Sequence, residues 1–190
     1  MAGSSRAALL EELRARVAPP GRTATLPFGI AAIDAALPRG GLAQGAVHEA
    51  AGTGPDLRHR TAPALLAAAV LARAGGPVLW ASARFDLSTP ALAKVGPGPE
   101  RVLHLEAGYE VQAAMEEGLH HPGLAGVVGE VPGRLGLTAS RRLQLAAEAT
   151  GAIAFALRRP IHPDDPALAE PADSNDASRG FRLKPATRSS

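Results

Sequence analysis

Short apolar runs alternate with helix-forming segments through the middle of this 190-residue chain, and that alternation constrains its fold more than any other feature. Strands of this kind, each followed by a helix, form a parallel sheet with helices on both faces. We therefore expect an α/β fold. The expected strands are 46–50, 78–81, 102–105, 124–128 and 153–157. The expected helices are 62–74, a short one capped by Ser88 or Thr89 that runs to Lys94, 110–120, and one capped by Thr138 that runs to Thr150.

The two ends of the chain differ from this middle part. Residues 6–17 fit a helix with leucines on one side, and the sequence Pro-Pro-Gly ends it at Gly21. After Pro160 the chain is too polar to bury its own surface, although 181–183 is a possible edge strand. We expect an N-terminal helix and linker over 1–21, an α/β domain over 22–160, and a mostly disordered tail over 161–190.

The amino-acid composition limits which classes of protein this chain can belong to. Hydrophobic residues make up 46% of the chain but aromatics only 3%, so the core must consist mainly of Ala, Leu and Val. The chain has no Cys, which excludes disulfides, cysteine-bound zinc and thiol catalysis. Charged residues near the N-terminus exclude a signal peptide, and the longest apolar run, 62–72, is too short to cross a bilayer. We expect a cytoplasmic protein with no membrane contact.

The segment from Gly29 to Arg60 leads into a phosphate-binding loop that lacks its working residues. A P-loop has Gly, four residues, then Gly-Lys-Ser/Thr, because backbone N–H groups cradle phosphate, the Lys neutralises it and the hydroxyl binds Mg²⁺. Counted from Gly52, those last three positions hold Leu57, Arg58 and His59. Pro55 also removes an N–H donor. The candidate loop residues are thus Gly52, Gly54 and Arg58, and we expect no bound cofactor.

The glycine pattern before this loop resembles that of the RecA-like P-loop ATPases, in which Gly-x-x-x-x-Asp and Gly-Gly-x-x-x-Gly precede the first strand. The matching residues are Gly29, Asp34, Gly40, Gly41 and Gly45. More narrowly, the region from Pro27 to Arg159 resembles the ImuA family, through F-G-I-A-A-I-D-A-A-L-P-R-G-G-L-A-Q-G-A-V-H-E-A-A-G, G-P-V-L-W, M-E-E-G-L-H-H-P-G-L-A-G-V-V-G-E-V and L-T-A-S-R-R-L-Q-L-A-A-E-A-T-G.

This resemblance implies a function in SOS-induced translesion DNA synthesis, which is damage-induced mutagenesis. The partners it implies are ImuB, an inactive relative of Y-family polymerases, an error-prone C-family DNA polymerase, and RecA. The family usually continues beyond the point where this chain ends. Two alternatives remain open, a degenerate nucleotide-binding ATPase of the RecA family and a cell-division inhibitor like SulA.

RecA-like ATPases also need a metal-binding acid at the end of a later strand and a general-base Glu after the second strand. Gly129 stands at the first position, and the neighbouring Glu130 faces the opposite side of the strand. Ala81 and Ala83 stand where the base is expected. Because three chemical roles are missing, we do not expect an enzyme. Binding of nucleotide without turnover, with Arg58 on phosphate, remains an alternative.

A basic edge is the remaining candidate surface. Arg141 and Arg142 open one helix, and Arg158 and Arg159 follow the last core strand. With Arg134 they form a candidate contact for DNA phosphate or for acidic groups of a partner, and an ordinary solvated face is the alternative. The scattered histidines do not have metal-ligand spacing, so we expect no metal site.

Overall fold

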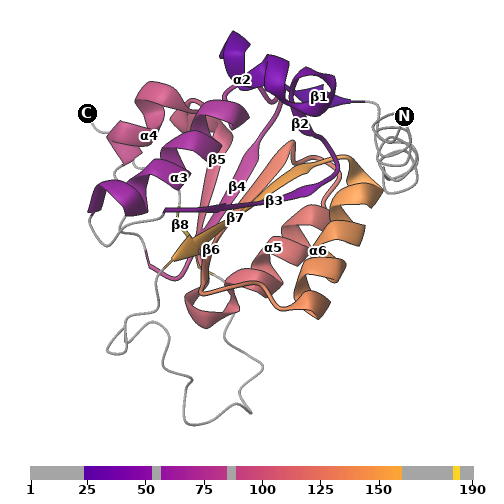
Figure 1. Ribbon diagram of the computed structural model, residues 1–190. Coiled ribbons are helices and arrows are strands. Elements are labelled where there is room, and N and C mark those ends of the chain that lie inside the picture. Colours follow the sequence, from indigo (N-terminus) through magenta and orange to yellow (C-terminus); the bar gives the residue numbers. More distant parts are fainter. Residues whose placement is uncertain (1–23, 53–56, 85–88, 160–181, 185–190) are drawn as a thin grey trace, which may run out of the picture.

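The computed structural model describes residues 24–52, 57–84, 89–159 and 182–184 (Figure 1). The side chains of 57–60, Thr89, Arg159 and 182–184 are not described. A six-stranded sheet has the order β3-β7-β6-β4-β5-β8, and all its pairs are parallel except that of β5 with β8. Its strands are β3 (Val47–Ala51), β4 (Val78–Ser82), β5 (Val102–Glu106), β6 (Gly126–Pro132), β7 (Ile153–Arg159) and β8 (Arg182–Lys184).

Helices cover both faces of this sheet, as the alternating pattern predicts (Figure 1). On one face α3 (Leu57–Leu71) and α4 (Thr89–Val95) enclose a core that contains Trp80 and Phe155. On the other face α5 (Val111–His120) and α6 (Leu137–Thr150) enclose a core that contains Met115. The expected α/β fold is confirmed. No described helix has both the length and the hydropathy that crossing a membrane requires.

Many core positions hold Ala, as the low aromatic content predicts. The central strand β6 goes further and uses glycines to let side chains from both helical layers approach its backbone. A Cβ on Gly126 would overlap the Leu71 side chain from α3, and one on Gly129 would overlap Met115 from α5. Because interiors are close-packed, neither position has room for a larger residue without movement of its neighbours.

Strand β6 is the largest correction to the expected boundaries. The sequence predicts a strand over 124–128, flanked by glycines. The strand instead begins at Gly126 and continues to Pro132. It passes through Gly129 because the missing side chain is what allows Met115 to pack there. The interior position of Glu130 is tolerated because its carboxylate accepts a hydrogen bond from the Trp80 indole N–H.

Helix α3 also differs from its expected bounds of 62–74. It begins at Leu57 and places Pro63, which reads as a first-turn residue, inside the helix. The turn that follows α3 is held by Arg101, from the 3₁₀ turn Pro99–Arg101, whose guanidinium donates to the carbonyls of Ala72, Ala74 and Gly76. Arg101 thereby provides donors for backbone acceptors in the turn that leads from α3 to β4.

Smaller differences concern two other elements. Helix α6 begins at Leu137 with Gly136 as its N-cap and has no side-chain capping bond, so Thr138 is not the cap. The edge strand β8 is Arg182–Lys184 rather than 181–183, and it pairs antiparallel with β5. The expected helix over 6–17 and most of the tail lie outside the described residues.

The segment before β3 forms a small unit that the sequence reasoning did not resolve into elements. Strands β1 (Thr25–Leu26) and β2 (Leu42–Ala43) pair antiparallel, and between them lie α2 (Ala31–Ala36) and the 3₁₀ turn Pro38–Gly40. A Cβ on Gly41 would lie 2.6 Å from the backbone oxygen of Leu26, so close pairing of these strands requires glycine there.

Candidate functional site

The carboxyl edge of the five parallel strands is where open α/β sheets place their ligands. The sequence predicts a pocket beyond Ala50, Ala81 and Val128. The first two strands end one residue later, at Ala51 and Ser82. Val128 is different because it lies in the middle of β6 and is fully buried, so that strand reaches this edge at Pro132.

The degenerate loop lies between β3 and α3. Gly52 follows β3 and is exposed, whereas Gly54 and Pro55 lie outside the described residues. Arg58 is in the first turn of α3, but its side chain is not described. The three positions that hold Gly-Lys-Ser/Thr in a P-loop are therefore the first three residues of a helix. The strand, loop and helix are retained in order, without the residue types that bind phosphate.

Gly129 and Glu130 face the helical layers on opposite sides of the sheet, and only one of these layers contains the helix that follows the candidate loop. Gly129 faces α5 and Met115. Glu130 lies on the face covered by α3, the helix that follows the loop, and it is 4% exposed. Its Oε1 accepts a hydrogen bond from Trp80 Nε1 at 3.0 Å. A carboxylate thus occupies the face of the candidate loop, but it is buried and bonded to an indole.

The neighbouring strand offers no acid for general-base chemistry. Ala81 and Ala83 are both buried in the core that α5 and α6 cover. Ser82, between them, is 1% exposed. An acid at either position would lie in an apolar environment and would disrupt the packing there.

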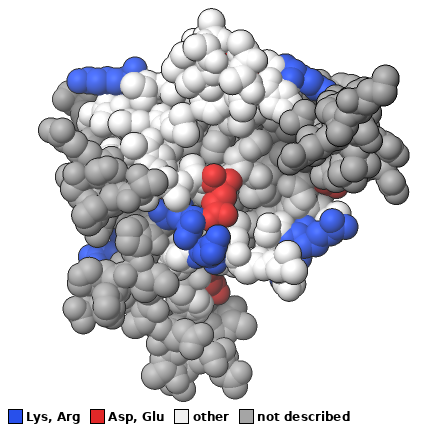
Figure 2. Space-filling view, viewed as in Figure 1, with Lys and Arg blue, Asp and Glu red and all other residues white. Residues whose placement is uncertain are grey.

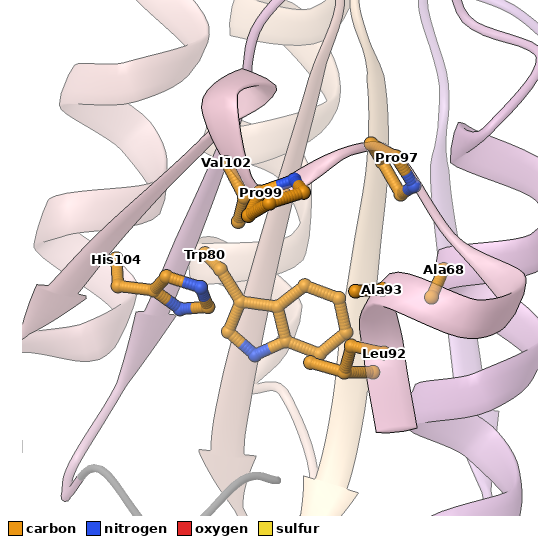
Figure 3. Close-up of a pocket in the computed structure, with 8 residues that line it drawn as sticks. All are labelled: Ala68, Trp80, Leu92, Ala93, Pro97, Pro99, Val102 and His104. Carbon is orange, nitrogen blue, oxygen red and sulfur yellow. The ribbon is translucent and has the colours of Figure 1, made fainter. Parts of the chain in front are cut away.

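A small pocket lies beside Trp80, between α4 and β5 (Figure 3). Figure 3 shows the indole and the His104 ring side by side, with Pro97 and Pro99 above them. The cavity volume is about 10 Å³, which is room for roughly one water molecule. Apart from the two rings, its lining is aliphatic: Ala68, Leu92, Ala93, Pro97, Pro99 and Val102. A nucleotide does not fit in this pocket.

His104 makes the stability of this region sensitive to pH. Burial lowers the pKa of His104 below its ordinary value of 6.5, because the charged ring is poorly solvated there. As pH falls through 6.5, the unfolded chain therefore takes up this proton before the folded chain does, and the free energy of unfolding decreases. We expect the urea midpoint, followed by Trp80 fluorescence, to fall as the pH is lowered below about 6.5. A His104→Gln variant should show a smaller fall, and an unchanged fall would contradict this assignment.

The arginines expected to form a basic edge are partly neutralised. Arg142 in α6 pairs with Glu116 of α5 at 2.9 Å. Arg158 in β7 pairs with Glu49 of the neighbouring strand β3 at 3.0 Å and also donates to the Gly133 carbonyl. In Figure 2 acidic and basic side chains accordingly lie together near the middle of the visible face.

The remaining arginines add less to a common surface. Arg134 and Arg141 are exposed, and the side chain of Arg159 is not described. Two of these arginines therefore form ion pairs with acidic residues, Arg142 between α6 and α5 and Arg158 between β7 and β3. Among the described residues, no group of three potential metal ligands comes together, so the histidines give no candidate metal site.

The sequence singles out Asp34 as part of a motif but does not reveal what its side chain does. Its carboxylate oxygens accept hydrogen bonds from the backbone N–H groups of Phe28 at 2.7 Å and Gly29 at 3.0 Å. Gly29 has a φ of 77°, a backbone conformation that favours glycine. The resemblance singled out the spacing of Gly29 and Asp34. This spacing lets the Asp34 carboxylate bind the backbone just before α2, and that contact shapes the start of the helix.

No protein-family model matches the chain. It is 36% identical over 143 residues to Protein ImuA from two strains of Caulobacter vibrioides, and the match covers 72% of this chain and 58% of each relative. The chain thus spans little more than half the length of these relatives.

Two solved structures are similar to the chain, to different degrees. The crystal structure of the RadB recombinase matches with a TM-score of 0.52 at 17% identity, over 82% of this chain and 75% of that one. The crystal structure of SulA from Pseudomonas aeruginosa matches with a TM-score of 0.49 at 19% identity, over 60% of this chain and 98% of that one. The RadB match shows a shared fold, and the 36% identity to Protein ImuA over 72% of the chain shows that this chain belongs to the ImuA family.

Proposed function

We propose that this chain is an accessory protein of damage-induced mutagenesis that acts by binding other proteins of translesion DNA synthesis, without hydrolysing ATP. The observation that carries this proposal is the 36% identity to Protein ImuA over 72% of the chain. The resemblance implies three partners, an ImuB-like inactive polymerase, an error-prone C-family DNA polymerase, and RecA. Any contact with DNA would then be indirect, through these proteins.

Three features of the candidate site support a non-catalytic mechanism. Leu57 stands where a P-loop has its second glycine. Gly129 faces Met115 in the core, so this position has no space for a metal-binding acid. Glu130, the acid on the other face, is buried and bonded to Trp80. Phosphoryl transfer depends almost entirely on positioned charge, and these residues do not provide it.

Two measurements test the proposal. Deleting the gene from the source bacterium should remove most mutations induced by ultraviolet light, and the wild-type gene should restore them; an unchanged mutation frequency would contradict the cellular function. In solution the purified chain should co-purify with the ImuB-like protein or with RecA and release no phosphate from ATP in the presence of Mg²⁺. ATP turnover that Arg58→Ala abolishes would show instead a degenerate working ATPase.

A further inference from the structure

Helix α2 is apolar, yet none of its residues is buried. Ile30, at its N-cap, is 54% exposed, and Ile33 is 39% exposed. Ala36 follows on the same side at helical spacing and is also exposed. Exposed apolar side chains grouped on one short element can mark a place where another molecule binds.

The surface is held in a fixed shape. Asp34 clasps the N–H groups of Phe28 and Gly29, just before the helix. Phe28 packs against the core that α3 covers, so the clasp joins α2 to the body of the domain. A surface that is already ordered loses little conformational entropy when it binds a partner.

The rim of this surface is basic. Arg39 follows α2 and is exposed, with a φ of 59° that is uncommon for a residue other than glycine. Arg73 is exposed at the end of α3, and its guanidinium lies against Gly29. Asp34 is the one acidic residue between residues 24 and 48, a range that the structure describes in full, and its oxygens face backbone N–H groups.

Figure 2 shows the outer surface of the molecule in this region. The protrusion at the top of the view, where Figure 1 labels α2, carries neither acidic nor basic side chains, and basic side chains lie on either side of it. We call Ile30, Ile33, Ala36, Arg39 and Arg73 the α2 patch.

We propose that the α2 patch binds a segment of a partner protein that presents apolar side chains flanked by acidic ones. The proposal deepens the proposed function, on which it rests, by naming the chemistry of the partner. Burial of the two isoleucines supplies the favourable free energy, and the arginine rim selects the sign of the partner's flanking charge. Two exposed isoleucines and two cations are less than stable attachment to a membrane requires, so a protein segment is the favoured occupant.

The first experiment uses synthetic probes and does not depend on the natural partner. One probe is an amphipathic peptide with leucines on one side and glutamates on the other, and the second has lysines in place of the glutamates. The full chain should bind the glutamate peptide at least several-fold more tightly than the lysine peptide. Ile33→Asp should abolish binding, and Arg39→Glu should reverse the preference between the peptides. Leu145→Asp is the matched control, because Leu145 is 49% exposed on α6, a different helix.

Several outcomes would overturn the proposal. Equal binding of both peptides, or binding unaffected by Ile33→Asp, would exclude the α2 patch. A peptide that binds only after residues 1–23 are removed would identify that segment as the occupant. A dimer in sedimentation that Ile33→Asp dissociates would identify a second copy. Co-sedimentation with anionic phospholipid vesicles that Ile33→Asp abolishes would identify a membrane.

The second experiment separates this proposal from the proposed function. If the ImuB-like protein or RecA binds the wild-type chain, Ile33→Asp should remove that binding and Leu145→Asp should not. Binding that survives Ile33→Asp would refute the α2 patch and leave the proposed function standing. If neither protein binds the wild-type chain, the proposed function fails, and the peptide experiment still decides the chemistry of the patch.

Discussion

Gly129→Asp is expected to unfold the chain rather than to restore a metal-binding site. The sequence resemblance aligns Gly129 with the metal-binding acid of RecA-like ATPases, so the substitution is the obvious attempt to recover activity. In this structure the added side chain would overlap Met115, which is fully buried in α5. The substitution therefore both overpacks the core and buries a charge without a partner. We expect a loss of more than about 4 kcal/mol in the free energy of unfolding.

Urea denaturation followed by Trp80 fluorescence measures this loss, because Trp80 is the one tryptophan in the chain. Gly129→Ala separates volume from charge and should cost about 1–3 kcal/mol. Gly136→Asp is the matched control. It makes the same change at the N-cap of α6, where a Cβ meets nothing within 4 Å and no side chain caps the helix. That variant should be as stable as the wild type or more so. A folded Gly129→Asp chain that binds Mg²⁺ would refute the prediction.

Glu130→Ala is expected to have the next largest effect. The substitution leaves the buried Trp80 indole N–H without its acceptor, 3.0 Å away in the wild type. It also leaves a cavity in a strand that is nearly fully buried. We expect a loss of about 2–3 kcal/mol. Trp80 emission should change in the folded state, because its hydrogen-bond partner is gone.

Glu130→Gln is the control for this second prediction. Its amide oxygen can accept the same hydrogen bond in nearly the same volume, so this variant should lose less stability than Glu130→Ala and keep the wild-type emission more closely. Equal losses for Glu130→Gln and Glu130→Ala would show that the carboxylate charge, rather than the bond to Trp80, determines the stability of this region.

The alternation of apolar runs and helices was enough to predict the α/β fold and the helical layers. It failed at Gly129, because glycine in a sequence indicates a break, whereas here it marks close packing between a strand and Met115. It also failed before β3. Strands β1 and β2 contain two residues each, too few for a periodic pattern. Helix α2 has only six residues, with one isoleucine and one aspartate among four alanines, so no amphipathic period distinguishes it.

For the candidate site, the missing motif residues could be predicted from the sequence, but the ion pairs of the arginines could not. The missing lysine, hydroxyl and acids can be read directly from the positions where a motif requires them. The pairing of Arg142 with Glu116 cannot, because those residues are 26 positions apart and meet only when α5 and α6 pack together. The pairing of Arg158 with Glu49 likewise depends on β7 lying next to β3, an order that sequence periodicity does not determine.

The contact between Met115 and Gly129 has a consequence for the evolution of such chains. A mutational path toward an acid at position 129 must first replace Met115 by something smaller, and that intermediate would leave a void in the core and lower its stability. Because selection removes unstable intermediates, an acid at position 129 cannot be reached by one substitution at a time. Loss of catalytic residues followed by core repacking can thus become difficult to reverse, even where the surrounding architecture persists.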